Sequence, residues 1–120
     1  MPRILVIDDE ENIRLLYEIE LKEEGYEIIT AATAEEALKI LETSEVDLIT
    51  LDIRLPGMNG IEFLRKVKEK KRELPVLMCT AYDDYKQDFG VWASEAYIVK
   101  SSDLAELKTR IKEFLKWKPA

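Results

Sequence analysis

The sequence predicts an α/β fold in which a parallel sheet is covered by helices on both faces. Three observations favour it. Short β-branched runs alternate with amphipathic helical patterns along the 120 residues, the connections between them are short, and several runs end in an ionisable side chain. Right-handed crossovers leave few other topologies for such an alternation. The length suits one domain with a full core, so we expect a single domain over residues 1–120.

The expected strands are short runs rich in Val, Ile and Leu. They lie at residues 3–7, 27–31, 48–51, 75–79 and 96–99. The run 48–51 is apolar on both faces apart from Thr50, as expected of a strand buried inside a parallel sheet. The run 27–31 has the weakest pattern, and we place it at an edge.

The expected helices are amphipathic, and two of them have recognisable ends. They lie at residues 12–24, 33–43, 61–70 and 104–116. Gly25 follows the first helix as its C′ residue, and Thr33 begins the second in a capping box with Glu36. Residues 83–94 are expected to form only a short, weakly stabilised helix, because Gly90 lies in its middle.

Composition excludes several classes of function. The net charge of −7 argues against direct binding of nucleic acid, which needs a basic face. No apolar run is long enough to cross a membrane and no signal peptide is recognisable, so we expect a cytoplasmic protein. The absence of histidine excludes His-based metal sites and Ser–His or Cys–His nucleophiles. Cys79, the one cysteine, is expected in the core.

Ionisable and hydroxyl side chains follow the strands. Asp8 and Asp9 follow the first strand and Asp52 the third, while Thr80 and Lys100 follow the fourth and fifth. The carboxyl ends of parallel strands meet at one edge, where α/β proteins bind ligands. Crowded carboxylates there need compensation, either from Lys100 or from a divalent cation, for which Mg²⁺ is the better fit. A carboxylate can also act as a nucleophile toward phosphorus, so the pattern points to phosphoryl chemistry.

Four segments carry a resemblance to a known family. They are Ile-Asp-Asp-Glu at 7–10, Leu-Asp-Ile-Arg-Leu-Pro-Gly-Met-Asn-Gly at 51–60, Thr-Ala-Tyr at 80–82 and Tyr-Ile-Val-Lys at 97–100. In this order and spacing, over essentially its whole length, the chain resembles the receiver domain of two-component response regulators. The resemblance implies a flavodoxin-like (βα)5 doubly wound parallel sheet with strand order 2-1-3-4-5. It also implies a phospho-acceptor signalling domain that catalyses only its own phosphorylation and slow dephosphorylation.

The resemblance further implies a magnesium site. Asp9 would bind Mg²⁺ directly and Asp8 mainly through water, while Asp52 and the backbone carbonyl of Arg54 would complete the protein ligands.

Asp52 would be the phospho-acceptor. Lys100 would pair first with its carboxylate and then with the phosphoryl group. Thr80 would move to hydrogen-bond a phosphoryl oxygen, and Tyr97 would turn inward with it as an aromatic switch. An ordinary half-buried strand aromatic remains the alternative for Tyr97, and a turn-capping hydroxyl remains the alternative for Thr80.

The implied partners are a sensor histidine kinase or histidine phosphotransferase and a downstream protein target. Ile13 and Leu16 flank the acidic end of the first helix, whose other apolar positions include Leu15 and Ile19. We expect Ile13 and Leu16 to contribute to a partner-binding face, with a core stripe as the alternative. The chain ends where a receiver domain ends, so we expect a stand-alone regulator, monomeric or dimerising on phosphorylation. If the chain is a fragment, an effector has been cut away.

The chain departs from the family pattern near its C-terminal end. Ser101 replaces the proline usual after the lysine, so the Lys100–Ser101 bond is expected to be trans or to form a strained turn. The stretch from Thr80 to Lys100 is about two residues short of the common pattern, and 93–96 replaces the usual Gly-Ala. These departures put the family's usual output geometry in doubt.

Three rival functions are compatible with parts of this pattern. A degenerate receiver that binds partners without phosphorylation remains the alternative, although the full set of acids, Thr80 and Lys100 argues against it. An aspartate-nucleophile phosphohydrolase would need a second Asp where Arg54 stands. A flavin-binding domain is rejected, because acids follow the first strand where such a domain binds phosphate.

Overall fold

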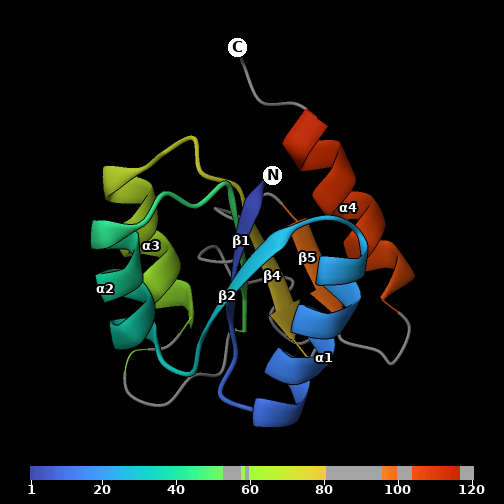
Figure 1. Ribbon diagram of the computed structural model, residues 1–120. Coiled ribbons are helices and arrows are strands. Elements are labelled where there is room, and N and C mark those ends of the chain that lie inside the picture. Colours follow the sequence, from blue (N-terminus) through green and yellow to red (C-terminus); the bar gives the residue numbers. More distant parts are fainter. Residues whose placement is uncertain (53–57, 59, 81–95, 100–103, 117–120) are drawn as a thin grey trace.

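A parallel sheet with helices on both faces forms the protein (Figure 1). The structure is a computed structural model that describes residues 1–52, 58, 60–80, 96–99 and 104–116, with only the backbone described for 80, 96–99 and 116. Its strands are β1 (Arg3–Ile7), β2 (Glu27–Ala31), β3 (Leu48–Leu51), β4 (Val76–Thr80) and β5 (Ala96–Val99). Its helices are α1 (Glu11–Glu23), α2 (Ala34–Thr43), α3 (Gly60–Lys70) and α4 (Ala105–Lys116).

The sheet has the order β2-β1-β3-β4-β5, and every neighbouring pair is parallel. The predicted α/β parallel sheet and its order 2-1-3-4 are therefore confirmed, with β2 at the edge. The predicted helix within 83–94 lies outside the described residues.

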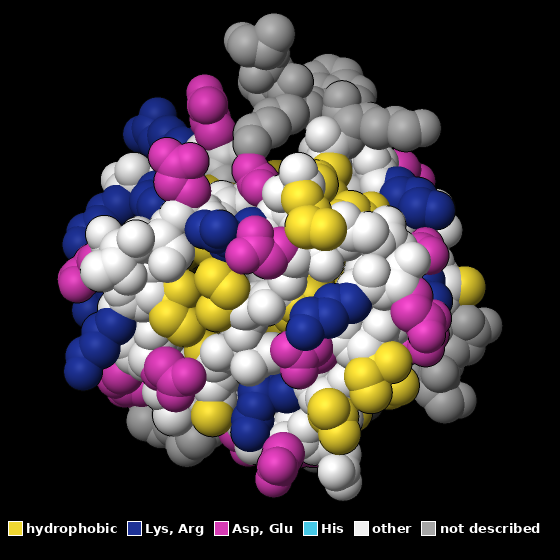
Figure 2. Space-filling model, in the orientation of Figure 1, with side chains coloured by type: hydrophobic (Ala, Val, Ile, Leu, Met, Phe, Trp, Pro, Cys, Tyr) yellow, Lys and Arg dark blue, Asp and Glu magenta, His cyan; other side chains and the backbone are white. Residues whose placement is uncertain are grey.

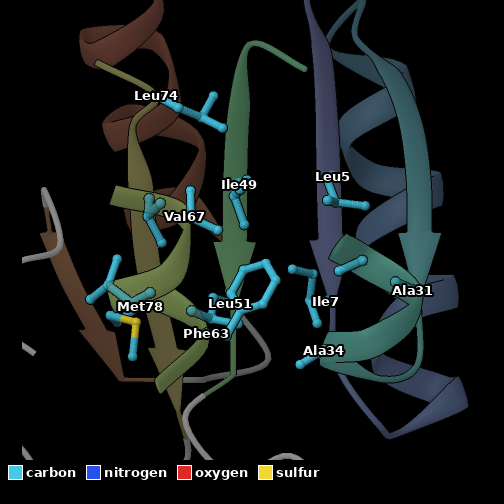
Figure 3. Close-up of a cluster of buried hydrophobic side chains, with 13 residues drawn as sticks. Leu5, Ile7, Ala31, Ala34, Ile49, Leu51, Phe63, Val67, Leu74 and Met78 are labelled. Atoms are coloured by element: carbon cyan, nitrogen blue, oxygen red, sulfur yellow. The ribbon is translucent and has the colours of Figure 1, made fainter. Parts of the chain in front are cut away.

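Two apolar clusters fill the space between the sheet and its helices. Leu5 and Ile7 of β1 point to the face covered by α2 and α3, where Phe63 fills the centre of one cluster (Figure 3). Ile4 and Val6 point to the opposite face, against α1 and α4. The period of two along a strand thus buries both faces of β1, which makes this central strand a rigid support for the residue that follows it.

The ends of two helices have the predicted local chemistry. The Thr33 hydroxyl accepts the N–H of Glu36 at 3.1 Å, as an N-cap should. At the end of α1, Gly25 has φ +95°, its N–H donates to Lys22, and the next N–H donates to Leu21. This pair of bonds is the Schellman motif, and it favours glycine because other residues rarely adopt that φ.

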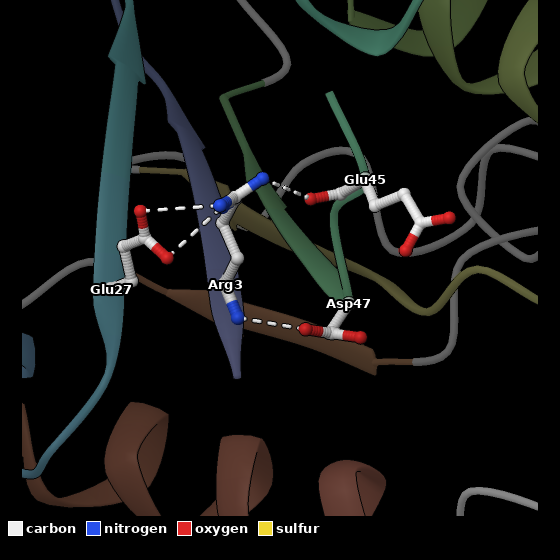
Figure 4. Close-up of polar contacts among 4 residues, drawn as sticks. All are labelled: Arg3, Glu27, Glu45 and Asp47. Carbon is white, nitrogen blue, oxygen red and sulfur yellow. Dashed lines mark hydrogen bonds and ion pairs between the residues drawn. The ribbon is translucent and has the colours of Figure 1, made fainter. Parts of the chain in front are cut away.

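Arg3 connects three segments at the amino edge of the sheet (Figure 4). Its guanidinium lies 3.2 Å from the Glu27 carboxylate of β2, with Nη2 donating at 3.3 Å, and Nη1 donates to the Glu45 carbonyl at 3.1 Å. Its backbone N–H donates to the Asp47 carboxylate at 2.8 Å. The start of β1 is therefore tied both to β2 and to the segment that leads into β3.

Ion pairs also join the two helices on one face of the sheet. Lys108 of α4 lies 3.0 Å from Glu20 of α1, and Lys112 lies 3.4 Å from Glu24. Within the described ranges, no helix is long and apolar enough to cross a membrane.

Replacing Arg3 with Ala should lower the free energy of unfolding by about 1 kcal/mol, because the guanidinium contacts are lost while the backbone bond to Asp47 survives. Urea unfolding would measure the loss, which should shrink at high salt. The matched control is Lys39→Ala on α2, an exposed side chain that makes no ion pair within the described part of the chain. Equal effects of the two substitutions would contradict a role for the Arg3 contacts.

Candidate functional site at the carboxyl edge of the sheet

The register of the two central strands determines where the acids lie. Ile7, the last residue of β1, stands opposite Leu51, the last residue of β3. The sheet hydrogen bonds continue one residue further, since the Asp8 N–H donates to Ala31 and the Asp52 N–H donates to Ile7, both at 3.1 Å. Asp8 and Asp52 therefore occupy neighbouring positions at one edge, as the sequence predicted for the carboxyl ends of adjacent parallel strands.

Both of these carboxyl groups are withdrawn from water. The exposed fraction is 2% for Asp8 and 6% for Asp52, whereas Asp9 is exposed. Buried carboxylates are rare unless they are paired or bind a cation. One Asp8 carboxylate oxygen accepts the N–H of Glu10 at 3.0 Å, and Arg14 Nη1 donates to the Asp8 carbonyl at 2.8 Å. The start of α1 thus orients Asp8 and brings a cation beside the acids.

Three acids form a group that could hold a metal ion. Asp8, Asp9 and Glu10 each offer a carboxylate oxygen, and these atoms lie within 4.8 Å of one another. Hard cations such as Mg²⁺ prefer oxygen ligands of this kind. Asp52 is not a member of this group among the described residues, but it lies on the adjacent strand end.

Tyr17 of α1 is buried beneath the acids, and sequence reasoning did not single it out. It packs in the same cluster as Cys79 of β4. Burial raises the pKa of Tyr17 far above its usual value near 10, and the neighbouring Cys79, Asp8 and Asp52 raise it further. Tyr17 and Leu21 are the two buried side chains of α1 and lie four residues apart. This i, i+4 spacing, which places both on one face of the helix, could have revealed Tyr17 from the sequence.

The remaining expected site residues are described only in part. Thr80 is the last residue of β4 and stands opposite Val99, while Tyr97 stands opposite Met78. The backbone thus places Thr80 at the carboxyl end of its strand, as predicted. Outside the described residues lie Arg54, Lys100, the Lys100–Ser101 bond and the segment 83–94.

The apolar side chains of the first helix differ in exposure. Ile13 and Leu16 are half-buried and pack against the cluster under α1 and α4. Leu15 and Ile19 are 53% and 50% exposed. The exposed apolar pair of α1 is therefore Leu15 and Ile19, one helical turn apart, next to the half-buried pair.

Family comparison agrees with this arrangement of fold and acids. Residues 4–112 match the family described as the response regulator receiver domain. The chain belongs to this family, and its residues place it among the receivers of two-component signalling. It is accordingly a phospho-acceptor signalling module rather than an enzyme that turns over a separate substrate.

Similar proteins come from several bacteria. The alkaline phosphatase synthesis transcriptional regulatory protein PhoP of Bacillus subtilis is 40% identical over 116 residues, covering 95% of this chain and 48% of PhoP. The response regulator ArlR of Staphylococcus aureus (strain Mu50 / ATCC 700699) is 35% identical, covering 99% of this chain and 55% of ArlR. The chain therefore spans about half the length of these curated relatives.

Solved structures share the fold closely. The response regulator TrrA of Thermotoga maritima, crystallised in complex with Mg²⁺ and beryllium fluoride, has a TM-score of 0.93 and 46% identity, covering 95% of this chain and 99% of TrrA. The complex of the histidine kinase ThkA with TrrA contains a chain with a TM-score of 0.91 and 47% identity, covering 96% and 99% of the two chains.

Because the pKa of Tyr17 is raised in the folded state, the unfolded chain loses this proton first as the pH rises above about 10. The free energy of unfolding should therefore fall there, with Tyr17 contributing a slope of up to about 1.4 kcal/mol per pH unit. Tyr17→Phe removes that contribution, and urea unfolding between pH 9 and about pH 11 would measure the difference in slope. Tyr26, whose pKa burial also raises, is present in both proteins and cancels. Identical slopes above pH 10 would show that Tyr17 is not held protonated.

Proposed function

We propose that this receiver accepts a phosphoryl group from a phosphohistidine partner onto Asp52. One observation carries the proposal. Two buried carboxyl groups, Asp8 and Asp52, lie at adjacent strand ends beside the exposed Asp9. TrrA, a relative with the same fold, was crystallised in complex with Mg²⁺ and beryllium fluoride, which supports a magnesium-dependent site. In the proposed transfer, an Asp52 carboxylate oxygen bonds to phosphorus as the phosphorus–nitrogen bond of phosphohistidine breaks.

The magnesium ion in this proposal is held by Asp8, Asp9, Asp52 and the backbone carbonyl of Arg54. The oxygen donors of Asp8 and Asp9 support it, because their carboxylates already lie within 4.8 Å of each other. When bound, Mg²⁺ supplies positive charge that offsets the crowded carboxylates and the incoming phosphoryl oxygens.

Three further residues complete the proposed site. Lys100 pairs with the Asp52 carboxylate and then with the phosphoryl group, and Thr80 donates a hydrogen bond to a phosphoryl oxygen. Tyr97 turns inward when Thr80 moves. The position of Thr80 at the end of β4 supports its part. The added charge at Asp52 then biases a two-state surface, as phosphorylation does elsewhere.

The proposed partners are a sensor histidine kinase or histidine phosphotransferase and a downstream protein target. The complex of TrrA with the histidine kinase ThkA supports a kinase partner. We place the docking face on α1, where Ile13 and Leu16 border the acids. The whole protein is proposed to be a cytoplasmic, stand-alone receiver with a flavodoxin-like (βα)5 domain over residues 1–120. We propose that it is monomeric until phosphorylated.

Intact mass measured after incubation with a small phosphodonor tests the central claim. The wild type should gain one phosphoryl group in the presence of Mg²⁺, and Asp52→Asn should gain none, because the amide oxygen is a poor nucleophile. The control is Asp47→Asn, which removes a different carboxylate next to β3. If the wild type gains nothing while Mg²⁺ is shown to bind, the chain signals by binding alone, as a degenerate receiver would.

Magnesium should stabilise the folded protein through its proposed ligands. At a Mg²⁺ concentration of about ten times its Kd, the free energy of unfolding should rise by about 1.4 kcal/mol. Asp9→Asn should abolish most of this gain, whereas Glu10→Gln should retain it because Glu10 is not among the proposed ligands. Thermal unfolding with Mg²⁺ and with EDTA provides the measurement. An equal loss in both variants would instead indicate that the local acidic group binds the ion.

A further inference from the structure

A groove on the far side of the sheet from α1 has no part in the proposed phosphoryl chemistry. It lies between α2 and α3 and has a volume of about 410 Å³. Its lining combines an apolar floor with charged sides: Leu38, Leu41, Glu42, Lys66, Val67, Glu69, Lys70 and Lys71. Leu38 and Leu41 are only partly buried, so the floor of the groove presents apolar surface to water.

The lysines of this groove differ in their contacts. Lys71 Nζ donates to the Leu41 carbonyl at 3.3 Å and so ties the end of α3 to α2. Lys66 and Lys70, one turn apart on α3, make no ion pair or hydrogen bond through their side chains within the described part of the chain. Two ammonium groups thus line the groove without an internal partner, although Glu42 and Glu69 also belong to its lining.

The charge around the groove is opposite to that of the whole protein. Its lining carries three lysines and two glutamates, a net positive charge in a protein of net charge −7. Lys and Arg side chains gather along the left of Figure 2, which is the side of α2 and α3 in Figure 1. The groove is therefore the place where an acidic partner would meet attraction rather than the repulsion of the chain's net negative charge.

We propose that the α2–α3 groove binds an acidic amphipathic helix of a partner protein. The groove lies between two helices, and its lining combines partly buried leucines with lysines. A helix can lay an apolar stripe on Leu38 and Leu41, which is the groove mode of helix recognition. Its flanking carboxylates then face Lys66 and Lys70. This binding does not require phosphorylation of Asp52.

Fluorescence anisotropy with a labelled synthetic helix tests the proposal. The probe is a peptide of Leu, Ala and Glu, about 18 residues long so that it can be helical, with leucines at i, i+3, i+4 and i+7. Lys66→Glu/Lys70→Glu should weaken its binding by roughly tenfold or more. The control, Lys39→Glu/Arg65→Glu, makes the same change of charge on the same two helices outside the groove lining, and it should weaken binding by less than about threefold.

Two further probes keep the test independent of folding defects and of simple charge attraction. A peptide with Lys in place of Glu should bind Lys66→Glu/Lys70→Glu more tightly than it binds the wild type. A scrambled, proline-interrupted peptide of otherwise equal charge should bind the wild type at least about tenfold more weakly than the helix does. Phosphoryl gain at Asp52 should be the same in both double variants, which separates this proposal from the preceding one.

Several results would overturn the proposal. They are no binding of the acidic helix to the wild type, equal weakening by the two double variants, and equal binding of the scrambled peptide. Preferential binding of anionic lipid vesicles, lost in Lys66→Glu/Lys70→Glu, would assign the surface to membranes instead.

Discussion

Two carboxyl groups lie next to each other out of water because β1 and β3 are paired in parallel and end at the same level. Buried carboxyl groups need hydrogen-bond donors or positive charge nearby. Arg14 brings one cation to this edge from the first turns of α1. The Mg²⁺ ion proposed above would add positive charge at the same place.

At the opposite edge of the sheet, charged side chains pair within the chain. There the cation of Arg3 meets the carboxylate of Glu27, and Asp47 accepts a backbone N–H. These charges are partly exposed and pair within the chain, so they contribute to stability and leave little for a ligand to do. At the carboxyl edge, by contrast, several acidic side chains lie close together. Between the two edges, the clusters on both faces of β1 keep the acids in position, and such rigid support is what a reactive site needs.

Sequence reasoning could place Asp8 and Asp52 because both acids stand at strand ends. The strand 3–7 was predicted with the bounds that the structure has, and its parallel pairing with β3 brings Asp8 beside Asp52. The buried face of α1 was harder to predict, because apolar residues surround much of this helix. At 100° per residue, Leu15 and Tyr17 lie about 160° apart, and only the packing against β4 and α4 decides which of them turns inward. Lys100 and Arg54 stay predictions, because they lie outside the described residues.

The sheet also separates two kinds of surface that the sequence alone does not distinguish. The acids and the exposed pair Leu15 and Ile19 belong to the ends of β1 and β3 and to α1, whereas Lys66 and Lys70 lie on α3, on the other face of the sheet (Figure 1). A partner that phosphorylates Asp52 through α1 and an acidic helix in the α2–α3 groove would therefore contact different faces. They need not compete for space, and any coupling between them would have to pass through the packed strands. Because close-packed interiors transmit strain, the packed sheet is the physical route for such coupling.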